Sequence, residues 1–168
     1  MPVDIPNFKI AEQNKVVTEL KLGRYAGPYV KRPIPLFRVS PIALVPKKKP
    51  GGIPVIKHLF HPKGYSMNDF ILDEACKVEY SKFDNAVELV ARIGKSAELA
   101  KSDIKSAFRL LFIAFQDFEL FGIKFDGKYY IDKCLLMGVR CALAYFEKIL
   151  KFFEYCVREI FIILSVRK

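Results

Sequence analysis

The chain has 168 residues, of which 52% are hydrophobic and 14% aromatic, with 28 Lys and Arg side chains against 18 Asp and Glu. This composition excludes the disordered class of proteins, whose chains are poor in hydrophobic residues, and the length fits one folded domain or part of one. The formal charge of +10 favours a polyanionic partner, nucleic acid first, because a basic protein attracts polyanions over long range.

No segment predicts a membrane span or a secretory signal. The longest apolar run near the end, IFIILSV, is shorter than the ~20 residues that a spanning helix needs. The first residues, MPVDIPNFKIAEQ, have no apolar core behind a basic start. We therefore expect an intracellular protein with no membrane partner, and the sequence does not distinguish nucleus from cytoplasm.

The first elements in the chain are predicted to be two strands joined by a basic turn. Most prolines lie in residues 27–54, where they restrict the backbone to extended and turn conformations. Residues 36–45 alternate as a strand does, KKKPGG is typical of the turn that ends it, and a second strand follows over residues 53–59. This pattern predicts a basic hairpin.

A helix and a central strand are expected next. Asp84 is a good N-cap, apolar residues between Ala86 and Ile93 form one stripe, and Gly94 ends the helix, which we expect to pack on a sheet. Residues 98–104 are short and apolar, as a central strand is. Asp103 then lies at the C-terminal end of that strand, where open sheets tend to place ligand chemistry.

The last predicted elements are a tight hairpin and a long helix. In FGIKFDGKYYID, the Asp126-Gly127 pair supplies the positive φ angles of a two-residue turn. From Ala142 to about Ile160, apolar residues recur at helical spacing with charged residues between them. Strands and helices in mixed order predict an α+β fold.

Cysteines and histidines give no sign of a metal centre. The cysteines form no C-x-x-C pair, and no histidine lies near enough to complete a zinc site, so we expect free, buried thiols at Cys76, Cys134, Cys141 and Cys156. His58 and His61 lack a carboxylate or thiol at ligand spacing. A place at the surface or at a strand end is therefore favoured for both histidines.

Taken in order, these stretches resemble a reverse transcriptase, the RNA-directed DNA polymerase of a retroelement. The likeness is greatest to the polymerases of DIRS-type, tyrosine-recombinase retrotransposons, which carry stretches similar to SPIALVPKKKPGG, KGYSMNDFI, KSDIKSAFRLL, FELFGIKFDGKYYIDKCLLMG and FEKIL. It spans roughly residues 20–166. The resemblance implies the fingers and a partial palm of a right-hand polymerase, with antiparallel palm strands packed on helices. Residues 1–30 are then an N-terminal arm and lead-in, residues 31–97 a fingers-like region with a basic hairpin, and residues 98–168 a partial palm that ends before the second catalytic motif.

The resemblance also implies a two-metal site for deoxynucleotidyl transfer. Two Mg²⁺ ions stabilise the attacking and leaving oxygens in such chemistry, and carboxylates hold the ions. By position in the family motif, Asp103 is the first metal-binding aspartate and the backbone carbonyl of Ile104 a further ligand. Phe108 is then the bulky gate that excludes a 2′-hydroxyl. The alternative is a strand-end Asp that caps a turn, beside a core Phe.

Further residues are implied to bind the deoxynucleoside triphosphate and the RNA or DNA template-primer. Lys47 and Lys48 occupy the fingertip turn that contacts the triphosphate in the family. Met137 and Gly138 match the start of the family's L-P-x-G motif, where a small residue lets template and nucleotide approach the backbone. A solvated charge run and a plain turn are the alternatives for these two features.

The sequence departs from the family pattern in several places. Pro54 stands where an Arg normally grips the triphosphate, and family prolines are replaced by Phe112, Phe115, Leu136 and Leu143, so displaced loops and exposed aromatic rings are expected. No Asp-Asp pair occurs, so two of the three catalytic carboxylates are missing from these residues.

These departures predict a reverse transcriptase fragment that is inactive alone. The alternative is a non-catalytic remnant that still binds nucleic acid. We also expect self-association through an uncovered edge of the palm sheet.

Overall fold

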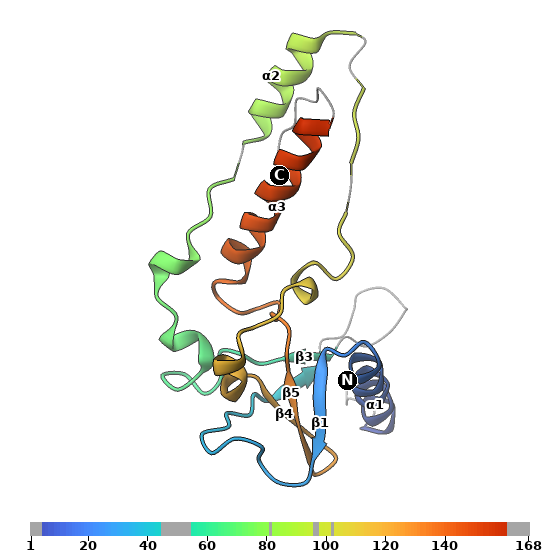
Figure 1. Cartoon of the computed structure of the whole chain (residues 1–168), viewed down its shortest axis with the longest axis vertical. Helices are drawn as coiled ribbons and strands as arrows, with labels where there is room; N and C mark the ends of the chain where they lie inside the picture. The colour runs from blue at the N-terminus through green and yellow to red at the C-terminus, as the bar shows by residue number, and fades with distance from the viewer. Residues whose placement is uncertain (1–4, 45–54, 81, 96–97, 102, 161–168) are drawn as a thin grey trace.

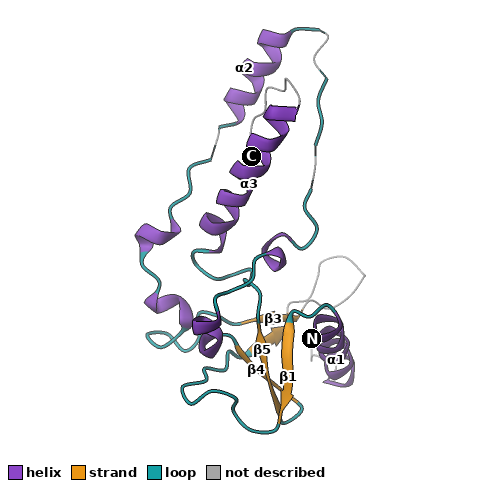
Figure 2. Ribbon diagram, viewed as in Figure 1, coloured by secondary structure: helices purple, strands orange, loops and turns teal. Residues whose placement is uncertain are grey.

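A computed structural model of the chain describes residues 5–44, 55–80, 82–95, 98–101 and 103–160. A small sheet lies beside the N-terminal helix α1 (Ile5–Lys21) at one end of the molecule, while helices α2 (Phe83–Ile93) and α3 (Ala142–Ile160) extend away from it (Figure 1). Helices and strands are mixed along the chain, as Figure 2 shows. The predicted α+β class is therefore confirmed.

The main sheet is antiparallel, with the strand order β1-β5-β4. Strand β4 (Gly122–Phe125) and strand β5 (Lys128–Asp132) form the predicted tight hairpin. Its turn residues have positive φ angles, 47° at Asp126 and 71° at Gly127, because a two-residue turn must match the twist of its strands. Strand β1 (Tyr25–Tyr29), which the sequence pattern did not predict, pairs with β5 in an irregular register.

The two strands of the predicted basic hairpin are also present. Strand β2 (Ile42–Leu44) pairs antiparallel with strand β3 (Val55–Lys57), and both are shorter than expected. The connecting residues 45–54, with Lys47, Lys48 and Pro54, lie outside the described residues. The pairing of this hairpin is thus confirmed, but its turn is not described.

Two expectations about the middle of the chain are wrong. The described residues between 98 and 104 form no strand; most of them are exposed, and Ser106, which follows, adopts a left-handed conformation with φ 57° that does not suit a strand. Helix α2 buries none of its side chains fully and lies away from the sheet in Figure 1, so it does not pack there. Its N-cap is Lys82, which places Asp84 in the first turn, whereas Gly94 ends the helix as expected.

Buried side chains form two apolar clusters. One lies under the loops that lead to α3 and contains Leu59, Met67, Phe121, Leu135, Leu136, Val139 and Ala142. The other joins α1 to the main sheet through Val16, Tyr25, Ile123 and Tyr130. All the cysteines are free, but only Cys134 is buried. Within the described ranges, no helix has both the length and the apolar character needed to cross a bilayer.

Candidate functional site

Segments that are far apart in the sequence meet beside the loop that precedes α3. The backbone N–H of Leu135 donates to the carbonyl of Leu111 at 2.7 Å, and the N–H of Ile113 donates to the carbonyl of Lys133 at 2.9 Å. An antiparallel bridge between Phe112 and Cys134 lies between these two bonds. The stretch that follows Asp103 is therefore paired with the stretch that leads to Met137 and Gly138.

Asn68 adds a third segment to this meeting point. Its Nδ2 donates to the carbonyl oxygen of Gly138 at 2.8 Å, and its Oδ1 accepts from the backbone N–H of Arg140 at 2.9 Å. Ser66 holds the same turn from the other side, because its Oγ donates to Asp69 at 2.7 Å. This hydrogen bond and the one from the Ser66 backbone lower the pKa of Asp69. The turn after β3 is thereby tied to the turn before α3.

The structure brings together only some of the predicted site residues. Phe108 is half-buried in the short 3₁₀ helix η3 (Ala107–Leu110). It packs against the apolar cluster under the loops that lead to α3, and its ring centroid lies 5.3 Å from that of Phe146. Met137 is 81% exposed, and Gly138 has a φ of 100°, a conformation that favours glycine. Asp103 is exposed outside any helix or strand, and Ile104 is half-buried. In the part of the chain that the structure describes, no three His, Cys, Asp or Glu side chains gather as metal ligands.

An apolar pocket of about 580 Å³ lies among the same segments. Its polar side chains include Arg38 and Asp117, and its apolar walls include Met67, Phe70, Leu111, Phe112, Phe121, Leu135, Val139 and Tyr145. Phe112 is 67% exposed and Phe115 is 83% exposed. The expectation that the rings of Phe112 and Phe115 are exposed is therefore confirmed.

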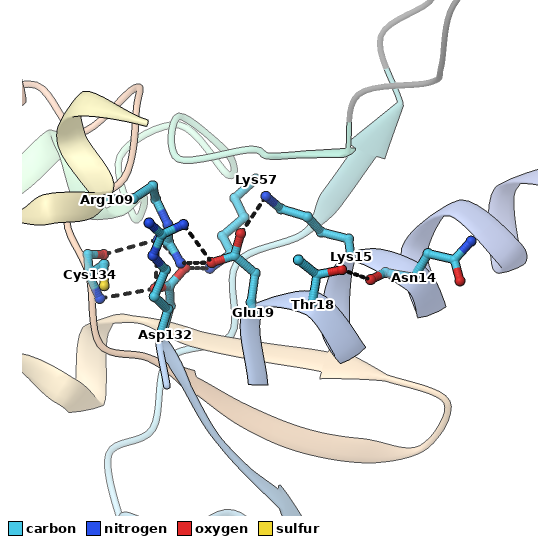
Figure 3. Close-up of polar contacts among 9 residues, drawn as sticks. Asn14, Lys15, Thr18, Glu19, Lys57, Arg109, Asp132 and Cys134 are labelled. Carbon is cyan, nitrogen blue, oxygen red and sulfur yellow. Dashed lines mark hydrogen bonds and ion pairs between the residues drawn. The ribbon is translucent and has the colours of Figure 1, made fainter. Parts of the chain in front are cut away.

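A buried charge cluster lies where α1 meets the main sheet, and the sequence analysis missed it (Figure 3). Arg109 is its centre: Nη1 donates to both carboxylate oxygens of Asp132, at 2.7 and 2.8 Å, and Nη2 donates to Glu19 at 2.7 Å. Lys57 pairs with Oδ2 of Asp132, and Lys15 donates to Glu19 at 2.6 Å. The cluster thus connects α1, β3, η3 and β5.

Burial and charge in this cluster shift several pKa values. Burial raises the pKa of Glu19, but hydrogen bonds from Lys15 and Arg109 outweigh it, so the pKa is lowered overall. Burial and the repulsion of Arg109 together lower the pKa of Lys57 to about 8, despite the attraction of Asp132. Burial next to Asp132 also raises the pKa of Tyr25 far above its ordinary value. The Glu19 carboxylate therefore stays ionised among these cations.

No pattern in the sequence predicts this charge cluster. Glu19 lies in a helix with many exposed polar residues, and Asp132 ends a strand whose last three residues are all buried. Alternation alone cannot reveal a charge that is buried because partners from other segments surround it. Comparison of the chain with models of protein families, with curated proteins and with solved structures finds no match.

Proposed function

We propose that the chain is the fingers and upstream palm portion of a retroelement reverse transcriptase, and that these 168 residues bind a template-primer without catalysing transfer. The observation that carries the proposal is the convergence of three stretches that match the family's motifs. Asn68, the segment after Asp103 and the turn at Gly138 meet through hydrogen bonds, although Asn68 and Gly138 are 70 residues apart. A polymerase needs these motifs side by side to act on one substrate.

The described residues do not fit a pair of Mg²⁺ ions. Asp103 is exposed, and the described residues contain no group of three potential metal ligands. Two divalent ions within a few ångströms need several carboxylates to offset their repulsion, and one aspartate does not supply them. These residues alone therefore lack the ligands of a two-metal transfer site.

The second candidate is a nucleic-acid-binding protein with no remaining nucleotide site. The net charge of +10 favours it, and Lys31, Arg32 and Lys63 are among the exposed basic residues. Such charges bind phosphates whatever the base sequence, and the affinity falls steeply with salt. Both candidates bind nucleic acid, so binding alone does not separate them.

Binding of a deoxynucleoside triphosphate in the presence of Mg²⁺ separates the two candidates. Titration of the wild-type protein, bound to an RNA–DNA primer-template, is compared with Asp103→Ala and with Asp84→Ala, a control for an exposed aspartate on α2. Mg²⁺-dependent binding that only Asp103→Ala loses supports a polymerase-derived site. Salt-sensitive binding of the primer-template without nucleotide binding supports the second candidate. A protein that binds no nucleic acid at low salt contradicts both, and nucleotide incorporation that Asp103→Asn abolishes contradicts the lack of catalysis.

A further inference from the structure

The buried charge cluster has an excess of positive charge. Its described ion pairs join four cations to two carboxylates: Lys15, Arg24, Lys57 and Arg109 with Glu19 and Asp132. The side chains of Lys57 and Arg109 are only 9% and 14% exposed, so water screens them poorly. This formal charge of +2, carried by side chains that are mostly buried, attracts a further anion.

The carboxylate of Glu19 contacts three cations of the cluster, as a bound anion would. Its Oε2 accepts from Arg109 Nη2 at 2.7 Å and lies 3.9 Å from Arg24 Nη1, while its Oε1 accepts from Lys15. Asp132 holds the opposite part of the cluster, where Lys57 and Nη1 of Arg109 contact it. The carboxylate of Glu19 therefore reaches from α1 into the group of cations around Arg109 (Figure 3).

One donor at this position remains unused. Among the buried side-chain polar atoms of the described residues, Nε of Arg109 is the one with no hydrogen-bond partner. The Nε–H and one N–H of Nη2 point the same way along the edge of a guanidinium group, where two oxygens of a single phosphate can accept from both. Glu19 uses only the Nη2 donor, because its second oxygen is engaged by Lys15.

We propose that Glu19 closes an anion site formed by Arg24 and Arg109, and that a phosphate group binds there when the Glu19 carboxylate withdraws. A phosphate has enough acceptor oxygens to use both free donors of Arg109 and to reach a second cation. Its charge also offsets the positive excess that Glu19 alone leaves. The segment that carries Glu19 is thus a built-in competitor of the ligand.

The docking of α1 is compatible with such competition. In the cluster between α1 and the sheet, the helix contributes Val16, which is buried, and Leu20, which is partly buried. Glu12 on the same helix is also buried, and burial raises its pKa. Burial of Glu12 therefore disfavours its charged form and does not help to attach α1 to the sheet. Glu19 therefore supplies the polar attachment of α1 that a phosphate can replace.

This inference is independent of the proposed function, because it needs neither Mg²⁺ nor Asp103. The test measures binding of inorganic phosphate by calorimetry at constant ionic strength, for the wild type, Glu19→Gln and Glu12→Gln. Glu12→Gln is the matched control, since it neutralises another buried carboxylate of α1 outside the cluster. We expect Glu19→Gln to bind phosphate at least about tenfold more tightly than the wild type, and Glu12→Gln to equal the wild type.

A second variant keeps the test decisive if Glu19→Gln does not fold. Glu19→Asp retains the charge but shortens the side chain, so phosphate is expected to raise its unfolding temperature more than that of the wild type. Adding Arg109→Lys to either Glu19 variant removes the guanidinium edge and is expected to abolish the gain. Equal phosphate binding by the wild type and the Glu19 variants, or a gain that survives Arg109→Lys, overturns the proposal.

The source of the phosphate is resolved in the same experiment by competition. A ten-residue thymidine oligonucleotide with a 5′-phosphate, the same oligonucleotide without it, and free phosphate are compared on Glu19→Gln. Competition by both oligonucleotides indicates backbone phosphates, competition by the phosphorylated one alone indicates a terminal phosphate, and binding of free phosphate alone indicates the small anion. Each of these results supports the site, and failure of all three to bind overturns it.

Discussion

Asn68 ties the turn after β3 to the turn before α3, because its Nδ2 donates to the carbonyl oxygen of Gly138 at 2.8 Å. The Oδ1 of the same amide accepts from the backbone N–H of Arg140, so both ends of the side chain are used. Asn68 is only 2% exposed, which means that water cannot replace either bond. One side chain therefore fixes how two loops lie against each other.

The first prediction concerns the loss of this amide. Asn68→Ala is expected to lower the free energy of unfolding by about 2–4 kcal/mol, since it leaves a buried carbonyl and a buried N–H without partners. Asn68→Asp keeps the acceptor for Arg140 but loses the donor to Gly138, so an intermediate or similar loss is expected. Urea denaturation measures both, with the exposed helix residue Asn85→Ala as the control. An Asn68→Ala protein as stable as that control would contradict the structure.

The second prediction concerns Gly122 at the start of β4, where two backbones approach closely. Its N–H donates to the carbonyl of Arg38 at 3.0 Å, and its own carbonyl accepts from the N–H of Ser40 at 3.1 Å. A Cβ atom on Gly122 would overlap the carbonyl oxygen of Arg38 and lie 2.7 Å from the buried ring of Phe37. Gly122→Ala is therefore expected to cost about 3 kcal/mol or more, because rigid backbone must move.

Gly23→Ala is the matched control for this substitution. Gly23 has a φ of 68° but nothing within 4 Å of its Cβ position, so only the conformational penalty of about 1 kcal/mol applies. The unfolding temperatures of the two variants separate the effects: Gly122→Ala reports the cost of crowding, and Gly23→Ala reports the cost of backbone strain alone. If Gly23→Ala proved as costly as Gly122→Ala, the close approach of the two backbones would not be the cause.

Local signals predicted the elements that depend on neighbours in the sequence. The hairpin at Asp126-Gly127 follows from a turn that only certain residues adopt, and α3 follows from apolar residues at helical spacing. Helix α1 was missed because its apolar face is narrow, with Val16 buried and Val17 42% exposed. A pattern search detects a wide apolar stripe far better than a narrow one.

Contacts between distant segments could not be predicted in this way. The pairing of β1 with β5 joins Tyr25 to Asp132 across more than a hundred residues, and no local pattern specifies it. The charge cluster has the same origin, since Arg109 is buried only because Glu19 and Asp132 meet it from other elements.

The predicted self-association at a sheet edge is disfavoured at strand β1. Pro28 lies in this edge strand and has no N–H to donate to a strand of a second molecule.

The third prediction tests how much the charge cluster contributes to stability. Arg109→Met removes the partner of two buried carboxylates, and the expected loss in the free energy of unfolding is about 3–5 kcal/mol. Arg109→Lys keeps the charge but cannot contact Asp132 and Glu19 through one planar group, so a smaller loss is expected. Arg92→Met on the exposed side of α2 is the control and is expected to change stability by less than about 0.5 kcal/mol. A tolerated Arg109→Met would show that Lys57 and Lys15 alone satisfy the carboxylates.

The fourth prediction is a dependence of stability on pH that comes from Lys57. Burial lowers its pKa from 10.5 to about 8, so between these pH values the unfolded chain binds the proton more tightly than the folded chain does. The contribution of Lys57 to the free energy of unfolding is therefore constant below pH 8 and rises toward pH 10.5, by up to roughly 3 kcal/mol. Tyr25, whose pKa burial raises, has the opposite effect above pH 10, because only the unfolded chain then ionises its hydroxyl.

Urea denaturation of the wild type and Lys57→Met between pH 7.5 and 9.5 isolates the lysine. Tyr25 stays protonated in both states through most of that range, and the raised pKa values of the Cys134 and Cys141 thiols affect both proteins alike. Wild-type stability is expected to rise across this range relative to Lys57→Met, which has no amine to titrate. Lys124→Met, an exposed lysine of β4, should keep the wild-type slope. If the wild type and Lys57→Met show parallel curves, then Lys57 retains an ordinary pKa. In that case the attraction of Asp132 compensates the burial of the amine completely.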